Sequence, residues 1–459
     1  MKDKRNLTEG NILSQLILIS LPIMGTSLVQ MAYNLTDLFW LGRYSTEAVS
    51  SAGFGGYFTW LGAAVIILAR IGTEVRIAQR VGSNDPQEAK EYAVTGVQVI
   101  VLLGLLYGAL LFFFPRFWLS FFNIQEQVIF EGAVDYLTII ALGMVFYALN
   151  PVLSATMIGK GNTVVPFLVS ATGLVVNMLL DPLFILTFNM GIKGAAIATV
   201  LAQVFVTLLF FVYFHFSRSA LLYRAKYWVT INTQKAWDIL RLGIPAAIQS
   251  AFFTFIAMTV SRLIVRVSGD QLAAVTAAQK VGSQLESLSW LVSGGIATAL
   301  GAFVGQNFGA KKYRRVFQGV RYALISMSIY GLAVTALLYF GARGLYSVFI
   351  PNDPRAVQVG TEYLRILAVS QVFMIIEAII GGAFNGFGRT IPQSVTSVVF
   401  NFLRIPMAYV FVGLIGINGI WWAISLSSVF KGLVIWLWFK VTVPAKQLIE
   451  SEPKSLRIA

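Results

Sequence analysis

Long apolar runs, separated by short polar and glycine-rich breaks, extend from residue 12 to residue 441 of the chain. A membrane-spanning helix needs about 20 mostly apolar residues, and Gly, Pro, Asn and charged residues mark the breaks between such helices. Several runs exceed about 25 residues, which indicates tilted or bent helices. The pattern predicts about twelve transmembrane helices, over residues 12–40, 50–79, 93–115, 132–158, 164–187, 192–216, 236–265, 272–304, 317–341, 358–385, 392–413 and 418–441.

Composition supports a membrane protein. Of the 459 residues 57% are hydrophobic and only 12% are charged, whereas about a quarter of an ordinary soluble domain is charged. This excludes a soluble enzyme, a disordered chain and a disulfide-stapled secreted domain. The chain has no Cys, and His215 is its only His, which excludes cysteine and histidine-rich metal sites.

The net charge of +14 is explained by basic residues in cytoplasmic loops rather than by nucleic-acid binding. Alternate loops differ strongly in their Lys and Arg content, and the richer set includes both termini and residues 311–315. We therefore expect both termini to be cytoplasmic, in the cell (plasma) membrane. The longest polar stretch, Ser217–Gln234, separates two halves. We expect a six-helix bundle over 1–220, a cytoplasmic linker over 221–234 and a second six-helix bundle over 235–459.

The two halves repeat the same short motifs in the same order. Because each half has an even number of spans, both enter the membrane from the same side, so the repeats are parallel and related by a pseudo-twofold axis along the membrane normal. Transporters commonly place the substrate between two such halves. The matched motifs are Gly159-x-Gly161-x-Thr163 with Gly386-x-Gly388-x-Thr390, Asn177…Pro182 with Asn401…Pro406, Gly191-Ile192-x-Gly194 with Gly416-Ile417-x-Gly419, and Pro22 with Pro245.

Carboxyl groups inside spans are costly and usually face a cavity or a partner. A rise of about 1.5 Å per residue places Asp37, Asp181 and Thr199 at one depth, in the outer half of the membrane. Asn177 lies one helical turn from Asp181, and Tyr33 lies one turn from Asp37. The predicted cation-coupling site comprises Asp37, Asp181, Asn177, Thr199, Tyr33 and Tyr136.

Such a cluster suits a proton, because two adjacent carboxylates in a low dielectric repel and one of them can then hold a proton near neutral pH. Carboxylate, amide and hydroxyl oxygens also suit Na⁺, which Asp37, Asn177, Asp181 and Thr199 would bind. The alternative is that these groups only hydrogen-bond to one another and fix helix packing.

Aromatic and methionine side chains on several spans predict an adaptable apolar cavity for flat organic cations, although helix packing or lipid contact is the alternative role for each. Glu377 either lines this cavity or pairs with Arg404 or Lys431. Arg70 and Glu74, four residues apart, are interpreted as a structural pair or as side chains that snorkel to the interface, rather than as functional residues. The predicted cavity residues are Gln30, Met31, Asn34, Phe252, Phe253, Thr254, Met258, Lys280 and Glu377.

The chain resembles the multidrug and toxic-compound extrusion (MATE) family over essentially its whole length. The features that carry the resemblance are the twelve spans, the repeat, Leu21-Pro22, Ile244-Pro245 and the Gly159–Thr163 turn. Tyr33…Asp37 with Asn177-x-x-x-Asp181-Pro182 resembles its DinF-like branch. The NorM-like branch carries a Glu on span seven, where this chain has Thr254.

The resemblance and the charged cluster together predict a secondary-active antiporter that exports lipophilic, often cationic, compounds in exchange for H⁺ or Na⁺. We expect no cofactor besides the coupling ion, no enzyme activity, no nucleic-acid partner and a monomer in the bilayer. A lipid-linked oligosaccharide flippase is the alternative, favoured by the basic Lys280, Arg404 and Lys431. A membrane-embedded enzyme lacks support because the sequence has no GxxxxGK[ST], HExxH or GxSxG motif.

Overall fold

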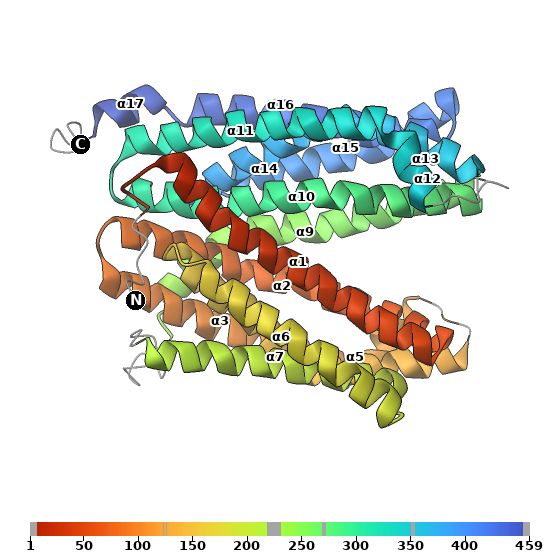
Figure 1. The fold of residues 1–459 in the computed structure, drawn as a ribbon. Helices are drawn as coiled ribbons and strands as arrows, with labels where there is room; N and C mark the ends of the chain where they lie inside the picture. Colours follow the sequence, from red (N-terminus) through yellow and green to blue (C-terminus); the bar gives the residue numbers. More distant parts are fainter. Residues whose placement is uncertain are drawn as a thin grey trace. The chain divides into compact units, whose positions relative to one another are not determined.

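The computed structural model describes residues 7–122, 124, 126–217, 231–268, 272–349 and 354–452, with the backbone alone at some positions. Every regular element in these ranges is a helix (Figure 1). They are α1 (Ile12–Tyr44), α2 (Thr46–Gly82), α3 (Pro86–Phe113), α4 (Pro115–Ser120), α5 (Gln127–Gly159), α6 (Val164–Pro182), the π-helical turn η1 (Leu183–Thr187), α7 (Gly191–Phe216), α9 (Thr233–Ser268), α10 (Leu272–Gly309), α11 (Tyr313–Phe340), α12 (Ala342–Phe349), α13 (Pro354–Ala368), α14 (Gln371–Gly386), α15 (Ile391–Ile415), α16 (Asn418–Thr442) and α17 (Ala445–Glu450).

Within the described part of the chain, 11 helices are long and apolar enough to cross a membrane. The pair α13 and α14 adds a twelfth crossing, so the prediction of an all-α protein with about twelve spans is confirmed. The predicted span over 358–385 corresponds to this pair, and the chain bends by 48° between the two helices. At the break, the Ser370 hydroxyl and amide both donate to the carbonyl of Leu367, at 2.9 and 3.1 Å. This bonding tightens the last turn of α13 and ends it.

The chain packs as two compact units. The first unit contains Leu18–Ala247, and the second contains Thr8–Ile17 and Ile248–Ala459. The boundary therefore falls within α9, so that the first 15 residues of this helix, up to Ala247, pack with the first unit. The pseudo-twofold relation between the halves stays a prediction.

In the first unit, close helix packing depends on small residues. On α3, a Cβ added at Gly108 would lie 2.7 Å from the carbonyl oxygen of Ala141 on α5. Buried side chains of α3 and α5, including Leu111, Leu137 and Met144, fill the space around this contact. Because lipid gives helices little hydrophobic reason to associate, such close backbone approach and dense packing supply much of the attraction between them.

The start of α9 packs just as closely on α2. A Cβ added at Gly72 would lie 2.2 Å from the carbonyl oxygen of Ile239, and one added at Gly243 would lie 2.0 Å from that of Leu68. The two glycines thus serve the same crossing from opposite sides. Only residues without a side chain permit this backbone approach, which fixes the first turns of α9 against α2.

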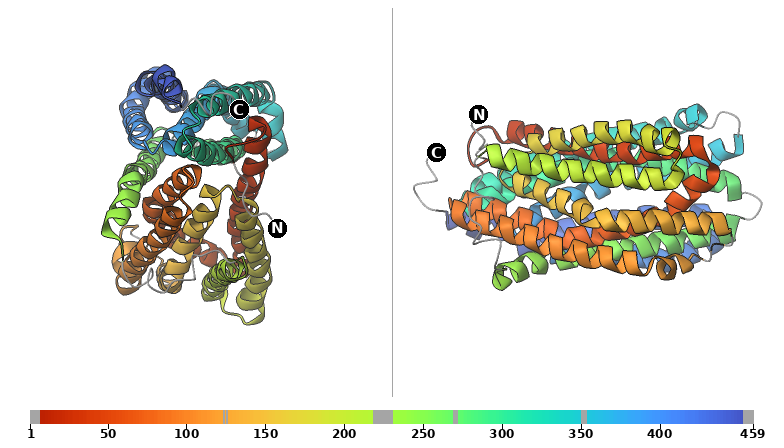
Figure 2. Two further views of the ribbon diagram at one scale, coloured as in Figure 1. Left: turned by 90° about the vertical axis from the view of Figure 1, so that its left-hand side faces the viewer. Right: turned by 90° about the horizontal axis from the view of Figure 1, so that it is seen from below.

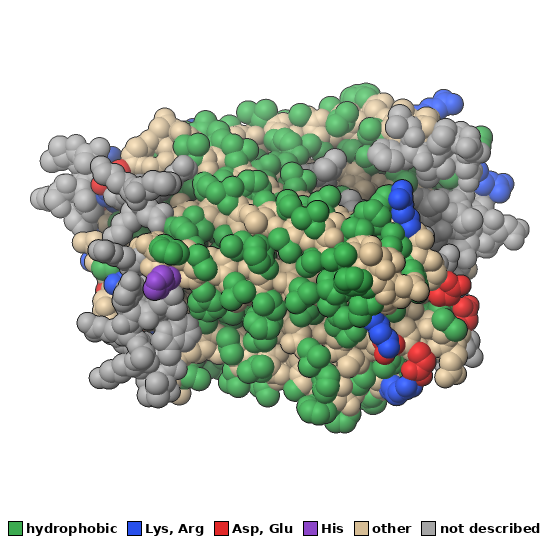
Figure 3. Space-filling view, turned by 60° about the horizontal axis from the view of Figure 1, so that its bottom comes forward, with side chains coloured by type: hydrophobic (Ala, Val, Ile, Leu, Met, Phe, Trp, Pro, Cys, Tyr) green, Lys and Arg blue, Asp and Glu red, His purple; other side chains and the backbone are tan. Residues whose placement is uncertain are grey.

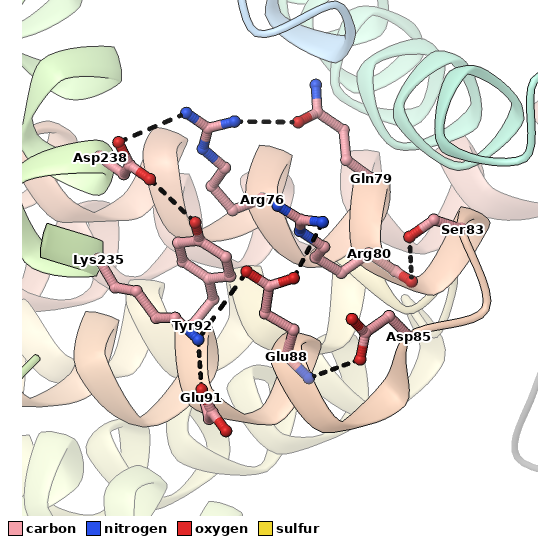
Figure 4. A network of polar contacts seen from close by, with 10 residues as sticks. All are labelled: Arg76, Gln79, Arg80, Ser83, Asp85, Glu88, Glu91, Tyr92, Lys235 and Asp238. Carbon is pink, nitrogen blue, oxygen red and sulfur yellow. Dashed lines mark hydrogen bonds and ion pairs between the residues drawn. The ribbon is translucent and has the colours of Figure 1, made fainter.

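A network of hydrogen bonds and ion pairs joins the same segment of α9 to α2 and α3 (Figure 4). Tyr92 on α3 donates a 3.0 Å hydrogen bond to Asp238, which also lies 3.9 Å from the guanidinium of Arg76 on α2. Lys235 bonds Glu91, its near neighbour on α3. Because its members come from α2, α3 and α9, the network orients the start of α9 relative to the other two helices.

The second unit is centred on α10, α13, α14 and α16. Trp421 is completely buried and meets the ring of Tyr363 edge-on, with centroids 4.8 Å apart. The hydroxyl of Tyr346, also buried, donates to the carbonyl of Ala278 at 2.6 Å. Tyr346 thus combines a large buried apolar area with a satisfied hydroxyl, as a buried Tyr requires.

The outward faces are apolar, as a lipid-facing surface requires. Figure 3 shows a broad band of hydrophobic side chains on one face, with most charged side chains gathered toward its ends. The helices α6 and α7, which lie side by side in both figures of the ribbon, carry exposed Leu179, Leu208 and Val212 (Figures 1 and 2).

Candidate ion and substrate site

The six residues predicted for ion coupling all lie in the first unit, on α1, α5, α6 and α7. Thr199 on α7 donates a hydrogen bond of 3.2 Å to Asp37 Oδ2 on α1. On α6, the amide of Asn177 donates a 3.1 Å bond to Asp181 Oδ1, and neither side chain is exposed. The carboxyls of Asp37 and Asp181 interact directly, so the two bonded pairs form one cluster.

This cluster has more buried acceptor oxygens than donors. Asp37 Oδ1, Asn177 Oδ1 and Asp181 Oδ2 are buried without a hydrogen-bond partner among the described residues, as is the hydroxyl of Tyr33. Buried polar atoms are rarely left unbonded in native proteins, and an ion or water commonly accounts for the exceptions. A proton or a small cation would satisfy these oxygens.

The ligand chemistry favours H⁺ or an alkali ion over a transition metal. The cluster offers carboxylate, amide and hydroxyl oxygens, which are hard donors. Across the described ranges, no three side chains of His, Cys, Asp or Glu come together in one place. The arrangement therefore suits an ion that exchanges readily rather than one held as a permanent structural metal.

The sequence of α6 explains how the cluster forms. Gly173, Asn177 and Asp181 are spaced four residues apart, so they lie along one face of the helix, and all three are buried. A Cβ at Gly173 would lie 2.7 Å from the hydroxyl of Tyr33, so only glycine leaves room for that hydroxyl. Pro182 then ends α6 and is followed by one π-helical turn, a feature that often marks functional sites.

Tyr136 borders the cluster from α5. Its ring packs against Gly55, where an added Cβ would lie 2.5 Å from the ring. The Tyr136 hydroxyl interacts electrostatically with Asp37 and Asp181. Its position on the rim of the cluster is compatible with the predicted role as a hydrogen-bond donor, which stays a prediction.

A cavity of about 250 Å³ lies within the first unit, next to the cluster. It is bordered by α1, α2, α5, α6 and α7, and Tyr33 is part of its wall. One end of Tyr33 therefore faces the cavity while its hydroxyl interacts with both carboxyls of the cluster. The main polar residues of the wall are Ser27, Gln30, Tyr33, Arg70, Asn150 and Gln203.

Of the predicted cavity residues, the wall of this cavity contains Gln30 but not Met31. The side chains of Asn34, Met258 and Lys280 lie outside the described residues. The others belong to the second unit, where their predicted role stays a prediction. Phe252 and Phe253 are exposed on α9, and the Thr254 hydroxyl bonds the carbonyl of Ser250 in its own helix; Glu377 lies on α14.

Glu377 is one member of a buried charged cluster in the second unit. It forms a 2.9 Å ion pair with Lys431 and accepts a 2.6 Å hydrogen bond from Ser397. Of the two pairings considered from the sequence, the structure thus has the one with Lys431. Arg404 instead donates to the hydroxyls of Ser427 and Ser428, at 3.1 and 3.3 Å.

Sequence reasoning missed Arg70 as a wall residue of the cavity. Arg70 and Glu74 interact electrostatically but form no ion pair among the described contacts, and only Arg70 borders the cavity. The interpretation of the two as a structural pair or as snorkelling side chains did not include this position of Arg70, and it stays a prediction. The signal was present, because an arginine inside a span generally faces a bundle interior or a water-filled space.

Comparison with known proteins gives consistent matches along the whole chain. The MatE family model matches residues 22–183 and 245–410. A probable multidrug resistance protein NorM of Thermotoga maritima is 27% identical over 93% of this chain and 92% of its own length. The probable multidrug resistance protein YpnP of Bacillus subtilis is also 27% identical, over 95% and 96%. A crystal structure of MATE in the bent conformation shares the fold, with a TM-score of 0.90 at 22% identity, covering 98% of this chain and 99% of that one.

Proposed function

Since this chain belongs to the MatE family, we propose that it is a secondary-active multidrug exporter that moves lipophilic organic compounds outward in exchange for H⁺ or Na⁺. The names of the relatives, both probable multidrug resistance proteins, support the export of small organic molecules. They do not favour the flippase alternative. The basic residues of alternate loops support a plasma-membrane location with cytoplasmic termini.

The position of Tyr33 carries the proposal of coupled exchange. This residue forms part of the cavity wall, and its hydroxyl interacts with the carboxyls of Asp37 and Asp181. A change of charge at the carboxyl pair therefore acts on a side chain that touches the substrate space. Antiport requires that ion and substrate prefer different states of the same protein, and a shared residue provides such a link.

The exchange follows from the hydrogen bonding of the cluster. In the structure, Asp37 accepts a hydrogen bond from the hydroxyl of Thr199, and Asp181 accepts one from the amide of Asn177. A proton or Na⁺ entering from outside lowers the negative charge shared by the two carboxyls and changes how α1, α6 and α7 are held together. The substrate leaves the cavity in the state that the bound ion favours.

The proposal is tested with the purified full chain in sealed vesicles, using ethidium as the transported probe. A pH gradient and a Na⁺ gradient are imposed separately, each with and without an ionophore that collapses it. We expect one of the two gradients to drive ethidium movement against its concentration and the matching ionophore to abolish it. Ethidium transport at the same rate with and without each gradient would contradict coupled exchange.

A further inference from the structure

We propose that the cavity of the first unit binds small aromatic compounds that carry a single carboxylate, and that the guanidinium of Arg70 holds this carboxylate. The inference rests on the proposed export function and narrows it. It adds to the expectation of cationic substrates a class of compounds, anionic or zwitterionic, that the sequence did not predict.

Arg70 is placed as a binding group rather than as a packing group. It lies 12 residues before the end of α2 at Gly82, which is about 18 Å along the helix, well inside the predicted span. A cation at such a depth is costly and is retained where it faces a cavity or a partner. Within the described part of the chain, Arg70 has neither an ion pair nor a side-chain hydrogen bond, and it borders the cavity.

The charge of Arg70 remains available to a ligand. Among the described residues of the cavity wall it is the only charged one. Asp37, Asp181 and Glu74 all lie outside that wall. Glu74, one turn further along α2, interacts with Arg70 without pairing with it and is itself 9% exposed. The wall therefore offers one positive charge and no acidic group to a bound molecule.

A neutral group on the same wall can complete the binding of an oxyanion. Thr163 is buried, and its hydroxyl has no hydrogen-bond partner among the described residues. This hydroxyl can donate, and a carboxylate accepts such a bond in addition to the paired bonds of a guanidinium. The cavity thus has an unused donor as well as an unused cation.

The remaining wall and the volume define the rest of the ligand. Ile23, Ile66, Tyr147 and Val206 provide an apolar and aromatic surface for a flat ring system. A volume of about 250 Å³ lies just below the usual 300–1,000 Å³ of drug sites, so a two-ring compound fits better than a lipid or a dinucleotide. One cation balances one carboxylate, whereas a phosphomonoester brings about −1.5 to −2 charges.

The test compares three probes that share one ring system: 2-naphthoate, 2-naphthamide and 2-naphthyl phosphate. Binding to the purified full chain is measured by calorimetry. We expect naphthoate to bind at least about tenfold more tightly than naphthamide, which corresponds to about 1.4 kcal/mol. Equal affinities for these two probes, or tighter binding of naphthyl phosphate, would overturn the proposal.

Variants of the chain assign the preference to Arg70. Arg70→Gln should bring the naphthoate-to-naphthamide ratio close to one while leaving naphthamide affinity unchanged. Arg80→Gln, on the same helix, is the matched control, because Arg80 pairs with Glu88 at 2.9 Å away from the cavity and its loss should leave the ratio intact. An unchanged ratio in folded Arg70→Gln protein contradicts the proposal.

Two further variants keep the test decisive if Arg70→Gln does not fold. Glu74→Gln removes the carboxyl group that interacts with Arg70 and should strengthen naphthoate binding several-fold without affecting naphthamide binding. Arg70→Lys keeps the charge but loses the planar pair of donors, and should lower the ratio partly. If naphthoate binding is unchanged in both variants, Arg70 does not hold the carboxylate. Ethidium export measured in parallel separates the two proposals: if export is gradient-driven but naphthoate is not preferred, only this inference fails.

Discussion

The hydroxyl of Thr199 lies within hydrogen-bonding distance of two acceptors, Asp37 Oδ2 at 3.2 Å and the carbonyl oxygen of Ala195 at 2.9 Å. A hydroxyl has one hydrogen, so it serves one of them at a time. A carboxylate at Asp37 attracts the hydroxyl, while a protonated Asp37 can itself donate to Thr199, whose hydrogen then turns to Ala195. The contact between α1 and α7 therefore has two bonding patterns, set by one proton.

Gly173→Ala should impair transport by displacing Tyr33. The added Cβ would lie 2.7 Å from the Tyr33 hydroxyl and 2.2 Å from Val206 Cγ2. We expect at least a tenfold loss of gradient-driven efflux with a folded protein, because an overpacked core commonly costs about 1–3 kcal/mol and shifts side chains. Efflux from vesicles and the thermal unfolding midpoint are measured together. Normal efflux would show that the position of Tyr33 is not critical.

Thr254→Ala should leave ion-driven transport largely intact. Its hydroxyl donates a 3.2 Å hydrogen bond to the carbonyl of Ser250 in the same helix. Removing the hydroxyl therefore breaks a bond within α9 and none of the described bonds between helices. This position also lacks the carboxylate expected in the NorM-like branch. The check is the dependence of efflux on the pH and Na⁺ gradients in the variant. A folded Thr254→Ala protein that has lost gradient-driven efflux would contradict a coupling role confined to the first unit.

Gly72→Ala and Gly243→Ala should each destabilise the first unit. Their added Cβ atoms would lie 2.2 and 2.0 Å from backbone oxygens of the facing helix, which cannot rotate away. We expect a cost of about 1–3 kcal/mol, seen as a lower thermal midpoint in detergent. Gly56→Ala on α2 is the control, because no atom lies within 4 Å of its added Cβ. Its helix should gain up to about 1 kcal/mol.

Glu377→Gln should be strongly destabilising, because it leaves Lys431 buried without a counter-charge. The two side chains are 12% and 9% exposed in their 2.9 Å pair. Breaking one partner of a buried pair costs about 3–5 kcal/mol, whereas replacing both can be nearly neutral. The double variant Glu377→Gln/Lys431→Met should therefore recover most of the lost thermal midpoint. A single variant as stable as wild type would show that the pair is not structural.

The fold was largely predictable from the sequence, because bilayer thickness imposes a long apolar run on every span. The exception was the break at Ser370, where a short serine-to-backbone hydrogen bond ends α13 inside an otherwise continuous apolar stretch. Hydropathy does not register such a bond, since serine is common in membrane helices. Helix boundaries elsewhere differ from the predicted ones by up to seven residues, the most at the start of α3.

The candidate ion cluster was predictable to a similar extent. Depth arithmetic brings Asp37, Asp181 and Thr199 to one level, but it does not give the rotation of each helix about its axis. Packing sets that rotation through residues such as Gly173, whose missing side chain is invisible to a search for polar groups. Arg70 was not predicted as a wall residue for the same reason: its spacing from Glu74 suggests a pair, whereas in the structure only Arg70 borders the cavity.

The most direct measurement is gradient-driven efflux by Asp37→Asn and Asp181→Asn proteins, equally folded and expressed, in sealed vesicles. Each change keeps side-chain size and hydrogen bonding but removes the titratable group. The account predicts that both variants still bind ethidium yet lose gradient-driven exchange, and that the double variant is no worse than either single one, because the pair acts as a unit. Wild-type pH or Na⁺ dependence in both single variants, with only a changed thermal midpoint, would contradict it and make the pair purely structural.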